Sequence, residues 1–289
     1  MILNIFILIV LAISVSVMVS WLIGKRRRSK MVNMLHAYVY GRWTNKYIHT
    51  LIHHVFPRLK PEGKKWFSDR YHGKILTPEL AEALITHDHD GHVHDLEQIV
   101  PYPHARKLIL KGPPDVAVFD CACRHARENP CQPIQVCMVV GKPFVEFILK
   151  QHKSARRLTQ IEAVDLLKAE YERGHLHSAW FKDAMGDRFY AICNCCKCCC
   201  GGIEAMVKHD APMMASSGYM AVVDEELCSA CETCVEVCPF NAVQVNDTAS
   251  VIWDACMGCG VCEGQCPSGA MSLQLDEKKG IPLDVRLLG

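Results

Sequence analysis

The chain has 289 residues, of which 50% are hydrophobic and 22% are charged. This composition excludes a disordered polypeptide and leaves room for one large domain or two small ones. The formal net charge is only +1, but it is unevenly distributed. Residues 219–275 hold eight acidic residues and no lysine, arginine or histidine, so residues 1–218 carry the compensating basic excess. Such asymmetry usually reflects binding partners rather than fold.

Residues 2–23 form an uncharged apolar stretch that predicts a transmembrane anchor. At ~1.5 Å per residue, a helix of this length crosses a hydrocarbon core of ~30 Å. Basic residues at 25–30 follow it, so the positive-inside rule predicts a single-pass membrane protein with the bulk of the chain on the cytoplasmic side. A cleaved signal peptide is the alternative, but its basic residues would precede the apolar stretch.

Residues 24–95 are predicted to form a basic juxtamembrane and helical segment. One helix is expected over residues 31–57, and Thr77 followed by Pro78 is typical of the start of another. Four histidines then lie close together: His87, His89, His92 and His94. They could bind a divalent metal ion, but the surrounding aspartates and glycine are more typical of a solvated turn.

Residues 96–218 are predicted to form a mixed α/β, cysteine-rich domain. The expected elements are, in chain order, a helix over 95–111, a strand over 114–119, a short helix over 143–151 and a helix over 159–173. The last of these is the best defined, because Thr159 and Glu162 fit a capping box and Gly174 supplies the stop.

This middle domain contains ten of the eighteen cysteines of the chain. They are Cys121, Cys123, Cys131 and Cys137, followed by Cys193, Cys195, Cys196, Cys198, Cys199 and Cys200. Exposed free thiols at this density would oxidise, so metal ligation is the better interpretation. The simplest division gives the first four to one iron–sulfur cluster and four of the later run to another. Ligand sets that mix the two runs, or a larger cluster, remain open, and Arg124 and Lys197 could donate hydrogen bonds to cluster sulfurs.

An internal repeat occupies residues 219–275. The pattern Cys-x-x-Cys-x-x-Cys-x-x-x-Cys-Pro runs from Cys228 to Pro239 and again from Cys256 to Pro267. Three closely spaced thiolates can reach three iron corners of one cubane, and the fourth has to come from elsewhere. Zinc is the alternative for paired cysteines, but the duplicated rhythm with Cys-Pro at both ends disfavours it.

The repeat resembles the bacterial ferredoxins that carry two [4Fe–4S] clusters. The resemblance implies a (βαβ)2 fold, low-potential one-electron transfer and a fourth ligand supplied by the opposite copy. It assigns Cys228, Cys231, Cys234 and Cys266 to one cluster, and Cys256, Cys259, Cys262 and Cys238 to the other. Together with one or two further clusters in the middle domain, these are the expected cofactors; residues 276–289 are expected to be a C-terminal tail.

The fold class expected for the whole chain is therefore α+β, with a transmembrane helix, a mixed middle domain and a ferredoxin-like C-terminal domain. The favoured function is electron transfer, because the sequence contains no glycine-rich nucleotide-binding loop. The expected partners are redox proteins with a basic docking face, within a larger membrane complex, and nucleic acid is not expected to bind.

Two other functions stay open from the sequence. The first is an iron–sulfur reductase with an open-site cluster, in which Arg124, His125, His175 and His177 would supply protons. The second is cluster assembly or metal handling.

Overall fold

A seven-stranded sheet forms the centre of the computed structural model, which describes residues 30–93 and 96–288. The strand order is β6–β4–β5–β8–β7–β1–β9, and neighbours are antiparallel except β1 and β9. The strands are β1 (Tyr71–Leu76), β4 (Val116–Asp120), β5 (Gln135–Val140), β6 (Arg156–Leu158), β7 (Leu176–Lys182), β8 (Arg188–Cys195) and β9 (Met214–Ala215). Strand β1 comes from the segment predicted as juxtamembrane, yet it lies inside the same sheet as the cysteine-bearing strands.

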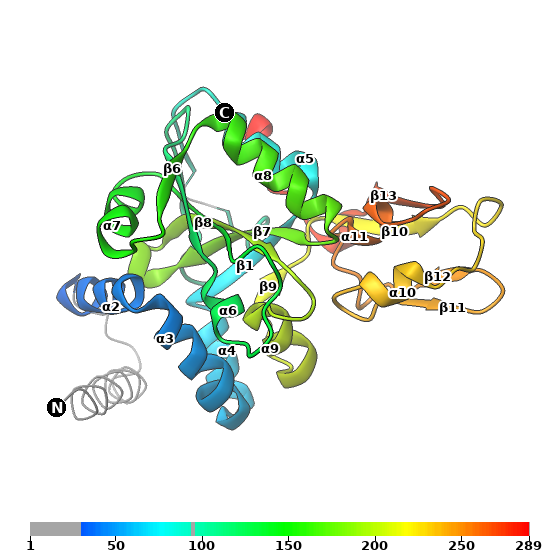
Figure 1. Cartoon of the computed structure of the whole chain (residues 1–289), viewed down its shortest axis with the longest axis horizontal. Helices are drawn as coiled ribbons and strands as arrows, with labels where there is room; N and C mark the ends of the chain where they lie inside the picture. Colours follow the sequence, from blue (N-terminus) through cyan, green and yellow to red (C-terminus); the bar gives the residue numbers. More distant parts are fainter. Residues whose placement is uncertain (1–29, 94–95, 289) are drawn as a thin grey trace.

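Helices cover both faces of this sheet (Figure 1). On one face, Leu80 and Leu84 of α5 (Pro78–Thr86) and Leu167 of α8 (Gln160–Glu172) join one apolar core. The other face carries a second core. Its helices are α2 (Lys30–Arg42), α3 (Thr44–Thr50), α4 (Pro61–Ser68), α6 (Ala122–His125) and α9 (Gly201–His209), while α7 (Phe144–Gln151) packs on β4 and β5.

Short elements connect these parts. They are a π-helical turn at Leu51–Val55, 3-10 turns at Phe56–Arg58, Asp183–Met185, Glu277–Lys279 and Val285–Leu287, and a small hairpin of β2 (Gly91–Val93) with β3 (Leu108–Leu110). The tail packs back on the sheet domain, because Leu283 and Val285 are completely buried in the core of α5 and α8.

Local capping signals are reliable guides to helix starts in this chain. The Thr159 hydroxyl accepts from the Glu162 amide at 3.2 Å, and the Thr159 amide donates to the Glu162 carboxylate at 2.8 Å, so the predicted capping box is confirmed. The Thr77 hydroxyl likewise caps α5 by accepting from the Leu80 amide. These bonds satisfy donors that the first helical turn leaves free.

Two predicted helices were wrong. The single helix expected over 31–57 is divided at Trp43, where the backbone leaves the helical region between α2 and α3. The helix expected over 95–111 is absent from the described residues 96–111, which form turns and end in β3. Pro101 and Pro103 lack the amide donors that a helix interior requires, which explains the second error.

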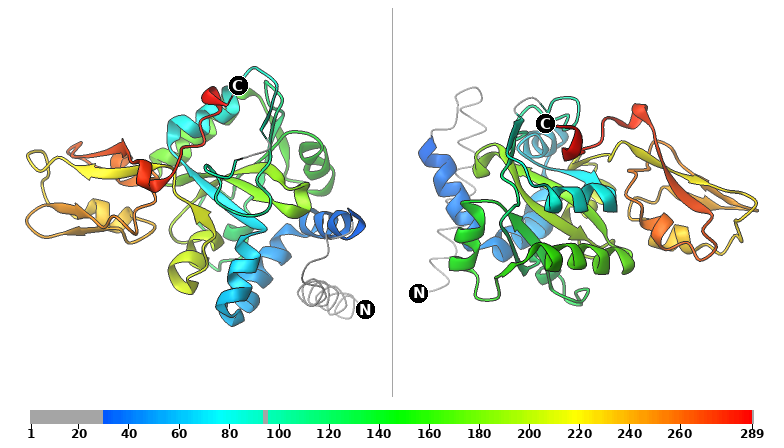
Figure 2. Two further views of the ribbon diagram at one scale, coloured as in Figure 1. Left: turned by 180° about the vertical axis from the view of Figure 1, so that it is seen from behind. Right: turned by 90° about the horizontal axis from the view of Figure 1, so that it is seen from above.

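Residues 219–275, here called the repeat unit, fold as two strand–helix–strand copies. The first copy contains β10 (Tyr219–Val223), α10 (Thr233–Val237) and β11 (Val243–Val245), and the second contains β12 (Ala249–Val251), α11 (Val261–Gly264) and β13 (Met271–Leu275). Strand β10 pairs with β13 and β11 with β12, so the first strand of each copy pairs with the last strand of the other copy. The repeat unit projects from the sheet domain on the side opposite α2 (Figure 2).

No helix within 30–93 or 96–288 is long and apolar enough to cross a membrane. The longest described helices, α2 and α8, have 13 residues, whereas a spanning helix needs about 20. The anchor predicted at 2–23 lies outside the described residues. The predicted fold class is therefore corrected to a mixed α/β fold with a C-terminal repeat unit and no supported transmembrane helix. The predicted single-pass membrane location is likewise not supported.

The buried Lys74 of β1 should make the free energy of unfolding depend on pH. Its ammonium group is buried and donates to the Ile281 carbonyl of the tail at 2.8 Å, and burial lowers its pKa from 10.5 to about 7. Between these two values the unfolded chain binds a proton that the folded chain does not, so stability rises with pH across this window.

Replacing Lys74 with Met should remove this slope, which is about 1.4 kcal/mol per pH unit for one proton. Urea unfolding of parent and Lys74→Met protein at pH 7, 8 and 9 measures it, with the exposed Lys208→Met as the control. Equal slopes in parent and Lys74→Met protein would contradict the prediction.

Candidate metal centres

The eight cysteines of the repeat unit gather around two separate cavities. One has a volume of about 10 Å³, the other of about 20 Å³. The first is lined by Cys228, Cys231, Cys234 and Cys266, and the second by Cys238, Cys256, Cys259 and Cys262. In both sets one thiol comes from the opposite copy, which is the arrangement that the resemblance implies; the ligand sets themselves stay a prediction.

Left-handed residues shape the cysteine loops. In the second copy Gly258 and Gly260 have φ of +62° and +80°, and in the first copy Ala230 and Glu232 take the equivalent positions with φ of +52° and +62°. This conformation is costly for residues other than glycine, so surrounding contacts must hold it. It turns successive amides and thiols toward the enclosed cavity, as a thiolate-bound cluster requires.

The ten remaining cysteines come from three parts of the middle domain. Cys121 and Cys123 lie where β4 enters α6, and Cys137 lies on β5. Cys193 and Cys195 lie on β8, and the loop at 196–200 leads from β8 into α9. Cys131 belongs to the irregular segment between α6 and β5.

Four of these thiols form a compact cluster, here called the four-thiol group. The sulfur atoms of Cys131, Cys196, Cys198 and Cys199 all lie within 4.8 Å of one another. The Cys131 and Cys198 sulfurs are 2.7 Å apart although 67 residues separate them in sequence. Arg127 fixes the loop by donating to the Cys199 carbonyl at 3.1 Å. The structure therefore mixes the two runs of cysteines and separates Cys131 from Cys121, Cys123 and Cys137.

The other six thiols line one cavity and are here called the six-thiol ring. They are Cys121, Cys123, Cys137, Cys193, Cys195 and Cys200. Hydrogen bonds from Cys193 and then Cys200 lower the pKa of Cys195 to about 6. The ring therefore includes a thiol that ionises readily, and thiolates are the ligand form of cysteine.

Arg124 and Lys197, singled out from the sequence, have different environments. Arg124 is completely buried and pairs with Glu170 at 2.8 Å, and Glu170 also bonds His175 at 2.7 Å. Burial alone would raise the pKa of Glu170, but its hydrogen bonds with His175 and Arg124 keep that pKa below its ordinary value. Lys197 instead donates to the Glu236 carbonyl of α10 at 2.7 Å. Nothing in the sequence marks Glu170, because a glutamate in a helix is usually exposed.

The histidines at 87–94 do not gather in the described part of the chain. His87 is buried and its Nδ1 bonds the Leu84 carbonyl at 2.9 Å, while His89 lies near the exposed Asp88. His92 is on β2, and His94 lies outside the described residues. Among the described residues, these histidines belong to no group of three or more His, Cys, Asp or Glu ligand atoms within 4.8 Å of one another; the four-thiol group is such a group.

Of the proton donors named for a reductase, Arg124 and His175 lie 3.2 Å apart, while His125 and His177 have other partners. His125 is partly exposed and 3.4 Å from Asp120, and the His177 Nδ1 bonds the Asn194 Oδ1 at 2.7 Å. His175 is engaged with Glu170. These side chains have structural partners in the folded chain.

Comparison with known proteins identifies the repeat unit. A family model described as "4Fe-4S binding domain" matches residues 221–244 and 249–272. Pyruvate synthase subunit PorD of Methanocaldococcus jannaschii is 32% identical over 62 residues, which cover 21% of this chain and 72% of that protein. The chain belongs to the 4Fe–4S ferredoxin family. It binds two [4Fe–4S] clusters in the repeat unit and is an iron–sulfur electron-transfer protein.

Two other relatives are parts of larger enzymes by name. Hydrogenase-4 component A of Escherichia coli is 31% identical over 28% of this chain and 41% of its own length. A tetrathionate reductase subunit of Archaeoglobus fulgidus is 31% identical over 34% of this chain and 55% of its own length. The chain thus spans about half the length of these two relatives, and each of the three matches covers at most about a third of this ferredoxin-family chain.

Proposed function

We propose that the chain is a multi-cluster electron-transfer subunit of a larger redox assembly. It passes electrons singly between partner proteins, the two clusters of the repeat unit and a third [4Fe–4S] cluster in the four-thiol group. Four thiols within 4.8 Å of one another match the ligand number of a cubane. The named relatives support the assembly, since they are subunits or components of a synthase, a hydrogenase and a reductase.

A contact made by Lys197 supports the proposal that the repeat unit exchanges electrons with the four-thiol group. This residue stands between Cys196 and Cys198 and donates to the Glu236 carbonyl at 2.7 Å. Helix α10, which contains Glu236, also contains Cys234 and directly precedes Cys238. The loop that holds the third cluster is therefore fixed directly to the helix that presents thiols to both other clusters.

The first cavity of the repeat unit is the better candidate for exchange with a partner. Its Cys231 is exposed, and so are the nearby Asp224, Glu225, Glu232 and Glu236, whereas all four thiols of the second cavity are buried. An acidic surface steers a basic partner toward the exposed cluster, and added salt should weaken this attraction. The second cluster then serves as the inner relay.

The grouping of thiols favours electron relay over the reductase alternative. All eighteen cysteines lie within the described residues and fall into three sets of four and one set of six. An open-site reductase cluster is expected to have three thiolates and an exposed iron beside a pocket. None of the described sets has three members.

A Lys197→Met variant should slow electron transfer between the repeat unit and the four-thiol group. Losing this hydrogen bond of an exposed lysine, worth about 0.5–1.5 kcal/mol, loosens the docked loop, and we expect a severalfold slower rate. Rapid chemical reduction followed by freeze-quench electron paramagnetic resonance would follow each cluster.

Lys208→Met is the matched control, because Lys208 is an exposed lysine paired with Glu204 on α9, away from this contact. Unchanged kinetics in Lys197→Met would contradict the relay through this loop. An iron content near eight atoms per chain, instead of about twelve or more, would contradict the third cluster.

A further inference from the structure

The six-thiol ring lines a cavity that is larger than the two cavities of the repeat unit. This cavity has a volume of about 60 Å³, compared with about 10 and 20 Å³ for the two cavities of the repeat unit. Each of the two smaller cavities corresponds to one [4Fe–4S] cluster, so their volumes show how much free space a cubane site has in this chain. The six-thiol cavity therefore has more free space than either cubane site of this protein.

The walls of the cavity suit an inorganic sulfur-rich group. Apart from the thiols, the lining is mainly apolar, with Ile52, Phe56 and Trp180 among its members. Gly201 and Gly202 bring the start of α9 so close to Ile52 and Trp180 that an added Cβ would lie 2.6 and 2.9 Å from them. Iron–sulfur clusters are held by thiolates inside hydrophobic surroundings of this kind.

Arg124 supplies an independent sign that a ligand belongs in the cavity. It lines the cavity and is fully buried, and its Nε is a buried donor with no partner among the described atoms. Its other nitrogens bond Glu170 and the Pro133 carbonyl. Unsatisfied buried donors are rare in folded proteins. A cluster sulfide or thiolate in the cavity would accept from this atom, and the guanidinium charge would offset the negative charge of the thiolates.

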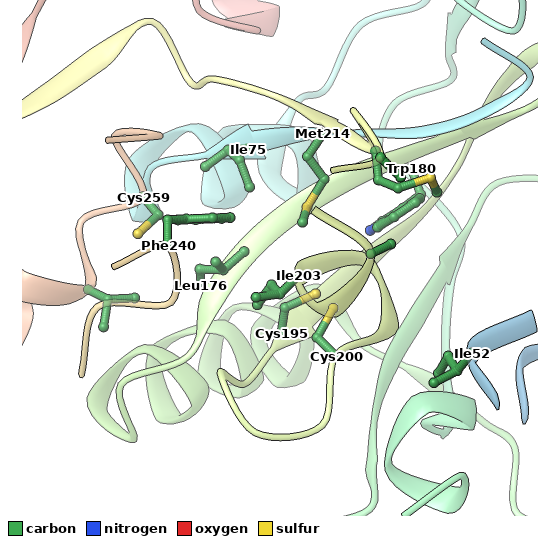
Figure 3. Packing of buried hydrophobic residues seen from close by; sticks show 14 of the residues in the cluster. Ile52, Ile75, Leu176, Trp180, Cys195, Cys200, Ile203, Met214, Phe240 and Cys259 are labelled. Atoms are coloured by element: carbon green, nitrogen blue, oxygen red, sulfur yellow. The ribbon is translucent and has the colours of Figure 1, made fainter. Parts of the chain in front are cut away.

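The cavity also adjoins the rest of the relay. Cys196 and Cys199 of the four-thiol group lie in its wall. Toward the repeat unit, Cys195 and Cys200 share one apolar core with Leu176, Phe240 and Cys259, as Figure 3 shows. Phe240 and Cys259 line the second cavity of the repeat unit. The six-thiol ring is thus connected by packed side chains with the four-thiol group and with the second cavity of the repeat unit.

We propose that the six-thiol ring binds one iron–sulfur cofactor larger than a [4Fe–4S] cubane, held by all six thiolates. A cubane uses four protein thiolates, and two unused thiols in contact with it would have no role. Three observations favour a single group in this cavity: six thiols line it, it is larger than the two cavities of the repeat unit, and the Arg124 Nε beside it has no partner among the described atoms. Binding of this cofactor does not depend on the proposed function; only the delivery of electrons to it rests on that function.

The test is a scan of Cys→Ala variants of the full chain, prepared without oxygen. Iron and acid-labile sulfide are counted, and Mössbauer spectra of isotopically labelled protein separate cubane iron from other iron. The parent should bind more than about sixteen iron atoms, because three cubanes account for about twelve. Each of the six variants should lose more than about four iron atoms, whereas Cys198→Ala should lose about four.

Two results would overturn the proposal. Two ring variants that keep the iron content and spectrum of the parent would mean a cubane with four ligands. A parent iron content near twelve, with the four-thiol cluster present, would mean that the ring binds no cluster, and would leave the proposed relay intact. Where a variant fails to fold, the parent spectrum still decides, because the proposal requires iron that does not belong to cubanes.

The proposed relay fails by a different result. Full iron occupancy with no electron transfer from the repeat unit to the four-thiol group would contradict the relay and leave the six-thiol cofactor in place. Kinetics and iron content therefore test the two proposals separately.

Discussion

A Gly258→Ala variant is expected to lose about four of its iron atoms, those of the second cluster in the repeat unit. Gly258 has φ of +62°, and an added Cβ would overlap the Tyr219 carbonyl oxygen and the Ser217 hydroxyl. Both belong to the segment that holds the cysteine loop, since the Ser217 hydroxyl donates to the Gly258 carbonyl at 2.7 Å. The clash cannot be relieved by a rotamer change, because a main-chain atom is in the way.

Gly269→Ala is the matched control for this experiment. Gly269 has a similar φ of +68°, but nothing lies within 4 Å of its added Cβ. Both variants therefore carry the left-handed strain of about 1–2 kcal/mol, and only Gly258→Ala adds the overlap. Iron counting and electron paramagnetic resonance of the reduced protein compare the two. Equal iron contents would show that the loop can move away from Ser217 and Tyr219.

The repeat unit was predictable because its information is local. The cysteine spacing within each copy, and the repetition of that spacing, indicate a thiolate loop without knowledge of distant contacts. The close approach of Gly258 to residues 217–219 is visible only in the structure, because it depends on a contact outside the motif.

The grouping of the middle cysteines could not be predicted because it depends on strand register. Antiparallel pairing sets Met138 of β5 opposite Ile192 of β8, so the next residues outward, Cys137 and Cys193, lie side by side. A shift of one residue would send one of them to the other face of the sheet. The sequence contains the cysteines but not this register.

Cys131 shows the same limit more strongly. It follows Cys123 closely in sequence, which favoured a common cluster, yet it lies 2.7 Å from the distant Cys198. The loop path between α6 and β5 decides this contact, and irregular segments are poorly specified by local pattern. Helix starts at Thr77 and Thr159 were predicted correctly because a single side chain determines each.

A Glu170→Gln variant is expected to destabilise the middle domain by about 3–5 kcal/mol. Glu170 is completely buried, and its carboxylate receives bonds from Arg124 at 2.8 Å, His175 at 2.7 Å and Arg173 at 2.9 Å. Glutamine keeps the shape but removes the charge, so the buried guanidinium of Arg124 loses its carboxylate partner. At about 2–4 °C per kcal/mol, the unfolding midpoint should fall on the order of 6–20 °C.

Glu146→Gln is the control, because Glu146 pairs with Arg157 at the surface, where both side chains are nearly half exposed. Its midpoint should stay close to that of the parent, since exposed ion pairs contribute little. Thermal unfolding under anaerobic conditions, followed by circular dichroism, compares the three proteins.

The size of the loss in Glu170→Gln also bears on the six-thiol ring. If the ring binds a negatively charged cofactor, that cofactor becomes the remaining counter-charge of Arg124 in the variant. The destabilisation should then be smaller in the iron-loaded protein than after removal of iron by a chelator. Equal losses with and without iron would mean that Arg124 pairs with Glu170 alone, and that its unpartnered Nε has no acceptor in the cavity.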